Sequence, residues 1–214
     1  MKLHYPNVLL DFDGTVCESG VAIIESVQAA CEKMGLTEGK PWENWRLYIG
    51  PTVYRYCTEH LGLSEEGRDE FMGYYSDHYN RVALYHAPLY DGMKELLEEL
   101  RAAGAGVYLC TSKPEALTLR SVEYLGLTFD GVVAQIPGRT KKDEVISYCL
   151  KEYGLDPASC VMIGDRASDV QGGQACGTAG IGVTYGYGSV EEMEGCGAQA
   201  VAHSVKELRE LLLG

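Results

Sequence analysis

Val8-Leu9-Leu10-Asp11-Phe12-Asp13-Gly14-Thr15 is the stretch that decides the fold. Its short apolar run predicts a buried strand, which stops abruptly at two carboxylates, a glycine and a hydroxyl. Ligands of open parallel α/β sheets bind at the carboxyl ends of the strands. Asp11 and Asp13 are two residues apart, so in a continuing strand both side chains would point to the same side. Two like charges this close favour a bound cation, and Mg²⁺ is the natural candidate because it binds carboxylate and phosphate oxygens.

Composition bounds the class of protein. The 214 residues suffice for one sizeable domain or for a core with a smaller insertion. The 46% apolar and 23% charged residues are typical of a globular protein. The net charge of −13 makes nucleic acid polymers and anionic membranes poor partners. A small phosphorylated metabolite remains a suitable partner, because a bound metal and a few cations can dominate the local field.

The sequence shows no targeting signal and no zinc-binding cysteine pattern. No apolar run approaches membrane-spanning length, and the first residues lack the apolar region of a signal peptide. The eight cysteines form no C-x-x-C pair and no zinc-ligand cluster, and Cys110 and Cys160 fall in predicted buried strands. We therefore expect reduced thiols and a cytoplasmic protein. Cys17 lies beside the aspartate loop, where a redox role is conceivable but ordinary packing is the better explanation.

The order of predicted elements indicates one domain inserted into another. Residues 16–86 carry helical periodicity and no convincing strand, with Ser64 as an N-cap. From Asp91, an expected N-cap, helices alternate with strands up to a last helix capped by Ser204. The predicted strands span residues 106–110, 131–135, 160–163, 179–183 and 198–202. This alternation predicts an α/β fold, a doubly wound and mainly parallel sheet built from residues 1–15 and 87–214, with a small helical domain at 16–86.

The loop after the second predicted strand begins with Thr111-Ser112. A hydroxyl together with backbone N–H groups near a helix start suits phosphate binding. The same residues also fit an N-cap before Pro114, and the two roles are compatible.

Charged residues follow the next strands. Lys141 and Lys142 begin a predicted helix, where a cation is slightly disfavoured unless a negative partner such as a phosphate or Asp11 lies nearby. Asp165 and Asp169 lie four residues apart, after an apolar strand and at a helix start. Right-handed crossovers bring these loops to one edge of the sheet. Four carboxylates there are costly without a metal, so the combination favours one.

Taken in order, these loops resemble the four motifs of the haloacid dehalogenase (HAD) superfamily. The D-x-D-G-T signature and the K-x-x-V-I pattern, which selects Lys142 with Lys141 as the alternative, carry the resemblance. It implies a Rossmann-like core, and the inserted helices resemble the type-one cap of the phosphoglycolate-phosphatase-like branch. A finer resemblance to bacterial 5′-nucleotidase-like members rests on four segments: Gly50-Pro51, Thr111-Ser112-Lys113-Pro114, Lys142–Ile146, and Gly186-Tyr187-Gly188-Ser189 with Glu191-Glu192.

The resemblance implies an Mg²⁺-dependent phosphatase that hydrolyses small phosphate monoesters through an aspartyl-phosphate. It implies Asp11 as nucleophile and Asp13 as general acid and then general base. A carboxyl at position 13 argues for ester hydrolysis over dehalogenation. The implied metal ligands are Asp11, the backbone carbonyl of Asp13, Asp165, and Asp169 acting through water or from the second shell. The implied phosphate-binding groups are Gly14, Thr111, Ser112 and Lys142.

The inserted helices are the expected specificity element. The candidates for substrate selection are Trp42, Trp45, Arg46 and Arg55, together with Lys113. The two tryptophans could stack a base or pack the core of the insertion. The arginines could bind a substrate carboxylate or second phosphate, or pair with Glu43 or Glu59.

Three other functions use a similar motif set. A sugar phosphomutase would share the catalytic residues, but the insertion shows no sign of re-presenting a substrate. A non-enzymatic phospho-acceptor domain also uses acids, Mg²⁺, Thr and Lys, but needs no cap. A scaffolding role for an inert fold is disfavoured because no motif residue is missing. The sequence leaves monomer and small homo-oligomer equally open.

Overall fold

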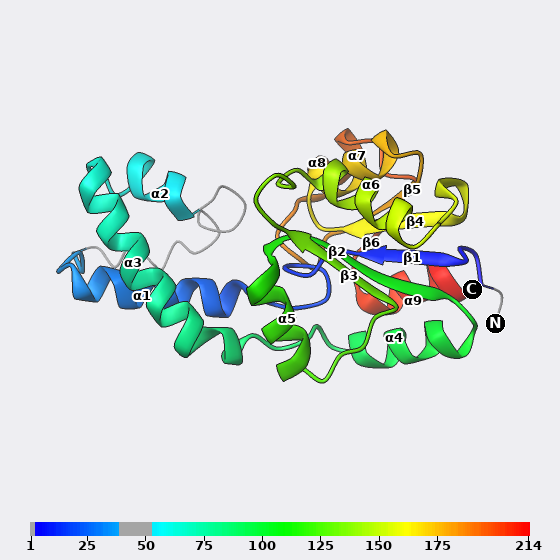
Figure 1. Cartoon of the computed structure of the whole chain (residues 1–214), viewed down its shortest axis with the longest axis horizontal. Helices are drawn as coiled ribbons and strands as arrows, with labels where there is room; N and C mark the ends of the chain where they lie inside the picture. The colour runs from blue at the N-terminus through cyan, green and yellow to red at the C-terminus, as the bar shows by residue number, and fades with distance from the viewer. Residues whose placement is uncertain (1–2, 39–52) are drawn as a thin grey trace. The chain divides into compact units, whose positions relative to one another are not determined.

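The structure is a computed structural model that describes residues 3–38 and 53–214 (Figure 1). The chain folds as two compact units. One contains the chain up to Glu18 together with Leu89–Gly214, and the other is Ser19–Pro88. Among the described residues, no helix is long and apolar enough to cross a membrane.

The larger unit is built on a six-stranded sheet in the order β3-β2-β1-β4-β5-β6, with every pair parallel. This confirms the predicted doubly wound parallel sheet. The strands are β1 Asn7–Leu10, β2 Gly106–Pro114, β3 Gly131–Gln135, β4 Cys160–Gly164, β5 Ala179–Val183 and β6 Ala200–Ala202. Leu10 pairs with Leu109 of β2 and Ile163 of β4, so the residues that follow these strands emerge side by side.

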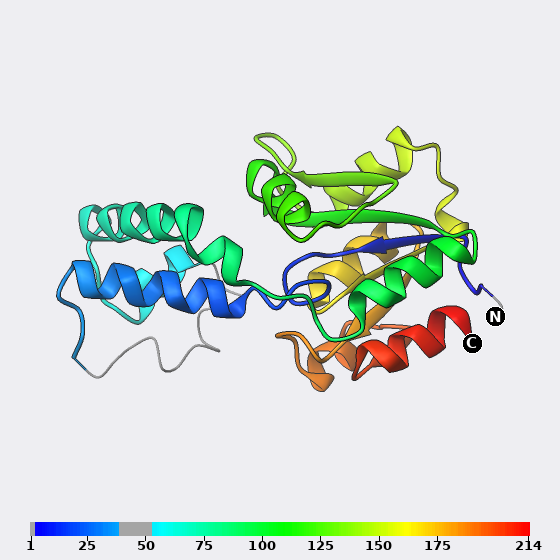
Figure 2. The same ribbon diagram turned by 90° about the horizontal axis from the view of Figure 1, so that it is seen from below.

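Helices cover both faces of this sheet, α6 and α7 on one and α4 and α9 on the other (Figures 1 and 2). The helices of this unit are α4 Met93–Ala102, α5 Glu115–Tyr124, α6 Lys142–Glu152, α7 Ala167–Ala175, α8 Val190–Gly195 and α9 Val205–Leu213, with a short 3₁₀ turn, η3, at Pro157–Ser159. The three-layer arrangement follows because each strand is apolar on both sides and must be covered twice.

Packing of α6 on the sheet forms one core cluster. Its inward face includes Ile146 and Cys149, which pack with Leu9 of β1 and Met162 of β4. All eight cysteines are free thiols, and seven of them are buried. Burial raises the pKa of the Cys110 thiol well above its ordinary value, so this residue behaves as a small hydrophobe.

Two local predictions were wrong and one was confirmed. Asp91 does not cap α4, because Gly92 takes the N-cap position with a left-handed backbone (φ +79°) and no side-chain cap forms. Strand β2 continues to Pro114 instead of ending at Cys110, with an irregular register beyond Cys110. Ser204 caps α9 as predicted, its hydroxyl accepting from the Glu207 N–H at 3.2 Å.

The smaller unit contains helices and no strand among its described residues, as predicted. It contains α1 Gly20–Lys33, α2 Val53–Glu59, α3 Glu65–Arg81 and the 3₁₀ turn η2 Ala83–His86. Val27, Tyr56 and Phe71 are buried in its own core. Ser64 caps α3 by accepting from the Gly67 N–H at 3.2 Å.

Candidate active site

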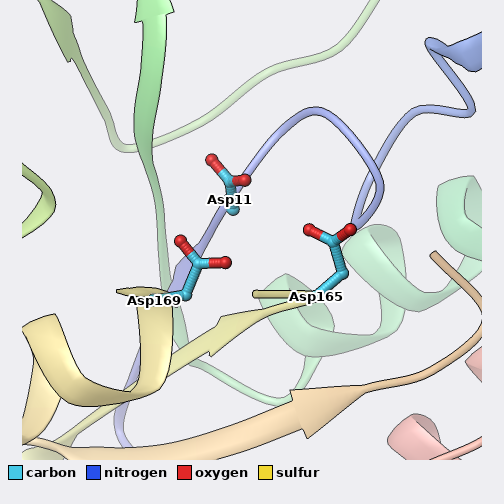
Figure 3. Close-up of side chains that lie close together, drawn as sticks. All are labelled: Asp11, Asp165 and Asp169. Carbon is cyan, nitrogen blue, oxygen red and sulfur yellow. The ribbon is translucent and has the colours of Figure 1, made fainter. Parts of the chain in front are cut away.

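Three buried aspartates converge at the carboxyl end of the sheet. Asp11 follows β1, and its N–H donates to the Ile163 carbonyl at 2.9 Å. Asp165 follows β4, and Asp169 lies in the first turn of α7. One carboxylate oxygen from each of Asp11, Asp165 and Asp169 lies within 4.8 Å of the others (Figure 3). The strand order therefore brings together residues more than 150 positions apart.

The ammonium of Lys142 binds this cluster. Its Nζ donates to Asp11 Oδ1 at 2.8 Å and to the Cys110 carbonyl at 3.1 Å, and it lies 2.8 Å from Asp169 Oδ1. Each of the three donors of an ammonium thus has an oxygen to face. Burial alone would lower the pKa of Lys142, but Asp11 and Asp169 outweigh it and hold the pKa above its ordinary value. Lys141 is exposed, so the structure brings Lys142 into the cluster and not its neighbour.

Burial and mutual repulsion disfavour the charged forms of Asp165 and Asp169, and a bound cation would favour them. Burial, with the charges of Asp169 and Asp11, raises the pKa of Asp165 well above its ordinary range. Burial also raises the pKa of Asp169 to about 6, although Lys142 opposes the shift. Asp165 Oδ2 accepts from the Tyr187 N–H at 2.9 Å, whereas its buried Oδ1 has no hydrogen-bond partner. An unpartnered buried oxygen among hard carboxylate ligands fits a divalent cation.

Glycines allow the loops to approach this closely. Gly14 has φ +80°, and a Cβ there would lie 2.2 Å from Asp165 Oδ2. A Cβ on Gly164 would lie 2.2 Å from the Asp169 Cγ, and one on Gly186 would lie 2.1 Å from the Gly14 carbonyl oxygen. Each glycine therefore leaves room for a neighbouring loop.

One expectation about Gly14 needs correction. The sequence suggested its N–H as a phosphate donor, but in the structure this N–H donates to the Cys17 carbonyl at 2.9 Å. The tight turn that follows Asp13 satisfies the group internally, so Gly14 contributes space and not a free donor.

Thr111 and Ser112 occupy different environments. Thr111 is buried, and its Oγ1 accepts from the Lys113 N–H at 3.2 Å. Ser112 is exposed and lines a pocket of about 490 Å³ beside Lys142. The remaining lining residues are Thr140, Lys141, Asp143, Ser168, Gln171, Gly172 and Ala175. Pro114 takes the N-cap position of α5 without a side-chain cap, so neither hydroxyl is engaged in capping.

Asp13 stands apart from the three-aspartate cluster. Its carboxylate is partly exposed, and both oxygens accept from Lys113 Nζ, at 3.0 and 3.2 Å. The expected metal contact of Asp13 concerned its backbone carbonyl, so the side chain is available for another task. Sequence reasoning offered Lys113 only as a specificity residue, because nothing local connects two positions a hundred residues apart.

Among the other specificity candidates, Trp42, Trp45 and Arg46 lie outside the described residues. Arg55 Nε lies 2.6 Å from Glu59 Oε1 in an exposed ion pair. Of the alternatives considered for Arg55, the structure therefore shows the surface pair.

Sequence reasoning missed the support around Asp165 and Asp169. Glu192 Oε1 accepts from Arg166 Nε at 3.0 Å and from the Ala167 N–H at 2.8 Å, which fixes the start of α7. Tyr185 donates from its hydroxyl to the Thr15 carbonyl at 3.1 Å. The Gly-Tyr-Gly tract and the following glutamates were visible in the sequence, but their spacing did not show that they fold against the aspartate loops.

Cys17 is packed inside the protein. It is buried, and burial together with the charge of Asp13 raises the pKa of its thiol to about 12. Because the thiolate is the reactive form, this environment favours the packing role that the sequence suggested.

Comparison with known proteins identifies the family. The sequence profile described as haloacid dehalogenase-like hydrolase matches residues 8–183. The chain belongs to this family. The match begins in β1 and ends with β5, and so contains all the loops that build the acidic site.

The relatives of this HAD hydrolase include proteins named as phosphatases and as a kinase. A protein named 5′-nucleotidase from Pseudomonas aeruginosa is 33% identical over 98% of this chain and 96% of its own length. A phosphoglycolate phosphatase from Chromobacterium violaceum is 28% identical over 98% and 97%. A protein from Mycobacterium tuberculosis named tyrosine-protein kinase PtkA is 30% identical over 96% of this chain and 72% of its own length.

Solved structures agree with this assignment. A candidate phosphatase from Clostridium difficile superimposes with a TM-score of 0.92 at 29% identity, covering 99% of this chain and 100% of that one. The family, the named relatives and the buried acidic site together make this HAD hydrolase a phosphatase.

A first prediction concerns Gly164. Replacing it with alanine places a Cβ against Asp169, which must move away from the cluster. At a concentration of 100 Kd, a cation stabilises the wild-type protein by roughly 2.7 kcal/mol, and we expect Gly164→Ala to lose most of this gain. Thermal unfolding with and without Mg²⁺ measures it. Gly195→Ala, whose Cβ would meet open space, is the matched control, and an unchanged Mg²⁺ effect in Gly164→Ala would contradict the prediction.

A second prediction concerns pH. The folded pKa of Asp169, about 6, lies above the ordinary value, so the cation-free protein loses stability as pH rises through 6. A cation needs the deprotonated carboxylates, so its stabilising effect should be small at pH 5 and grow towards pH 7.5. Unfolding temperatures measured with and without Mg²⁺ across this range test it. The exposed Asp69→Asn variant should keep the wild-type profile, and a pH-independent Mg²⁺ effect would refute the assignment.

Proposed function

We propose that this phosphatase is Mg²⁺-dependent and hydrolyses small phosphate monoesters through an aspartyl-phosphate on Asp11. The observation that carries the proposal is the set of contacts made by the Asp11 carboxylate. Its Oδ1 accepts from Lys142, and the residue belongs to the buried acidic cluster with Asp165 and Asp169. An aspartate oriented in this way is suited to attack phosphorus, because the ammonium holds one oxygen in place and leaves the other available.

The reaction has two halves. In the first, an Asp11 oxygen bonds to phosphorus, the bond to the ester oxygen breaks with its electron pair leaving on that oxygen, and Asp13 gives that oxygen a proton. In the second, water attacks the phosphorus of the aspartyl-phosphate and gives its proton to Asp13. The phosphorus–Asp11 bond breaks, and phosphate leaves. The partly exposed carboxylate of Asp13 suits this exchange of protons with substrate and water.

The metal and the phosphate-binding groups complete the proposal. Asp11 and Asp165, with the Asp13 carbonyl and with Asp169 in support, would hold Mg²⁺, which offsets repulsion between an anionic nucleophile and an anionic phosphate. Thr111 and Ser112 lie near the carboxyl end of the neighbouring strand β2 and would bind the phosphate oxygens together with Lys142. Lys142 already has three protein acceptors, so its main effect would be to orient Asp11.

The substrate class is a small phosphorylated metabolite. The names of the relatives favour a nucleoside monophosphate or phosphoglycolate. We propose that the helical unit Ser19–Pro88 is a specificity cap, and that the protein works in the cytoplasm, where its free thiols stay reduced. Phosphate release measured against a panel of such metabolites with Mg²⁺ would identify the substrate. An isomerised sugar phosphate in place of free phosphate would indicate a mutase.

A third prediction separates the two aspartates. Asp11→Asn should abolish turnover, because the neutral amide cannot accept the phosphoryl group. Asp13→Asn should slow turnover by about 10²–10⁴-fold. It should also accumulate the aspartyl-phosphate from an activated aryl phosphate, detected by intact-protein mass spectrometry after acid quench.

Mg²⁺-induced stabilisation should persist in Asp13→Asn, because its side chain lies outside the acidic cluster. Wild-type turnover in Asp13→Asn would remove its assigned role. Single labelling of Asp11 in the wild-type protein without phosphate release would instead indicate a phospho-acceptor domain.

A further inference from the structure

Lys113 has an arrangement that the family assignment does not explain. Its side chain is almost fully buried, yet its ammonium reaches both oxygens of the partly exposed Asp13 carboxylate, at 3.0 and 3.2 Å. The Phe12 ring lies 5.6 Å from the same nitrogen, within the range of a cation–π contact. A buried cation that engages both oxygens of one carboxylate restricts the rotation of that carboxylate.

The backbone of Lys113 is itself anchored on both sides. Its N–H donates to the Thr111 hydroxyl at 3.2 Å, and its carbonyl accepts from the Thr118 hydroxyl at 3.3 Å. The second contact ties the residue to the first turns of α5. Lys113 therefore reaches Asp13 from a rigid segment, the same segment that carries Thr111 and Ser112.

We infer that Lys113 is a positioning residue that holds Asp13 where it can protonate the leaving group. The inference rests on the proposed role of Asp13 and extends it to a specific partner. Proton transfer requires Asp13 to lie within hydrogen-bond reach of the ester oxygen, and small displacements of such a group are costly. Asp13 immediately precedes the tight turn at Gly14, whereas Lys113 belongs to the end of β2 that also carries Thr111 and Ser112. The Lys113–Asp13 ion pair would thus fix the position of the proton donor relative to the bound phosphate.

The leaving group provides the test. Phenyl phosphate and p-nitrophenyl phosphate have similar shapes, but phenolate is the stronger base and depends more on protonation as it leaves. We expect Lys113→Met to lower kcat/KM for phenyl phosphate about tenfold more than for p-nitrophenyl phosphate, because only the former needs a well-placed acid. Lys113→Arg keeps the charge and should restore much of the ratio. Lys151→Met, an exposed lysine on α6, is the matched control and should leave both rates unchanged.

A double-mutant cycle isolates the pair. In the Asp13→Asn background, Lys113→Met should no longer change the ratio of the two rates, because the acid it positions is absent. Unfolding temperatures with and without Mg²⁺ show whether each variant is folded. If Lys113→Met does not fold, the ratio of kcat/KM on the two substrates is compared in Lys113→Gln and Lys113→Arg instead.

The outcomes distinguish this inference from the proposed function. Equal losses on both substrates in Lys113→Met, or no loss at all, would overturn the role of Lys113 while leaving Asp13 as the acid. An Asp13→Asn variant that behaves like the wild type on phenyl phosphate would overturn the assigned role of Asp13, and this inference with it. A substrate-dependent loss that vanishes in the Asp13→Asn background supports both.

Discussion

The buried ammonium of Lys142 is the interaction on which the site depends. Three buried carboxylates at one sheet edge repel one another, and Lys142 binds two of them within 2.8 Å. Removing one partner of a buried ion pair generally costs about 3–5 kcal/mol, since the other charge stays in a medium that solvates it poorly. Lys142 therefore stabilises Asp11 and Asp169 together. It leaves Asp165, with one unpartnered oxygen, as the group with most to gain from a cation.

The strand order of the sheet determines where the charged side chains of the site lie. β1 lies between β2 and β4, so Asp11 emerges between the end of β2, which carries Thr111, and the loop that begins at Asp165. The distances within the site are short because glycines line the crossing points, and a methyl group at Gly14 or Gly164 would overlap an aspartate. Close packing of backbone against carboxylates concentrates negative charge here, and such a concentration suits a divalent cation.

Two aspartates of one motif acquire different chemistry from their surroundings. Asp11 is buried, paired with Lys142 and in the acidic cluster, whereas Asp13 is partly exposed and paired with Lys113. One environment suits a fixed nucleophile, and the other suits a group that trades protons with substrate and water. Lys113 comes from β2 and Lys142 from α6, so tertiary contacts, and not the motif itself, give the two aspartates their different environments.

The sequence alone determined the parallel sheet, its flanking helices and the helix caps at Ser64 and Ser204, because hydrophobic periodicity and capping are local properties. It also indicated Asp11, Lys142, Asp165 and Asp169, since each follows an apolar strand or begins a helix. Asp91 failed as a cap because the left-handed backbone at Gly92 replaced it. Only the tertiary structure decided that Lys113 binds Asp13, that the Gly14 N–H is satisfied by Cys17 and that Tyr187 supports Asp165. Those contacts depend on how loops pack against one another across a sheet edge, and no short-range pattern in a chain specifies that packing.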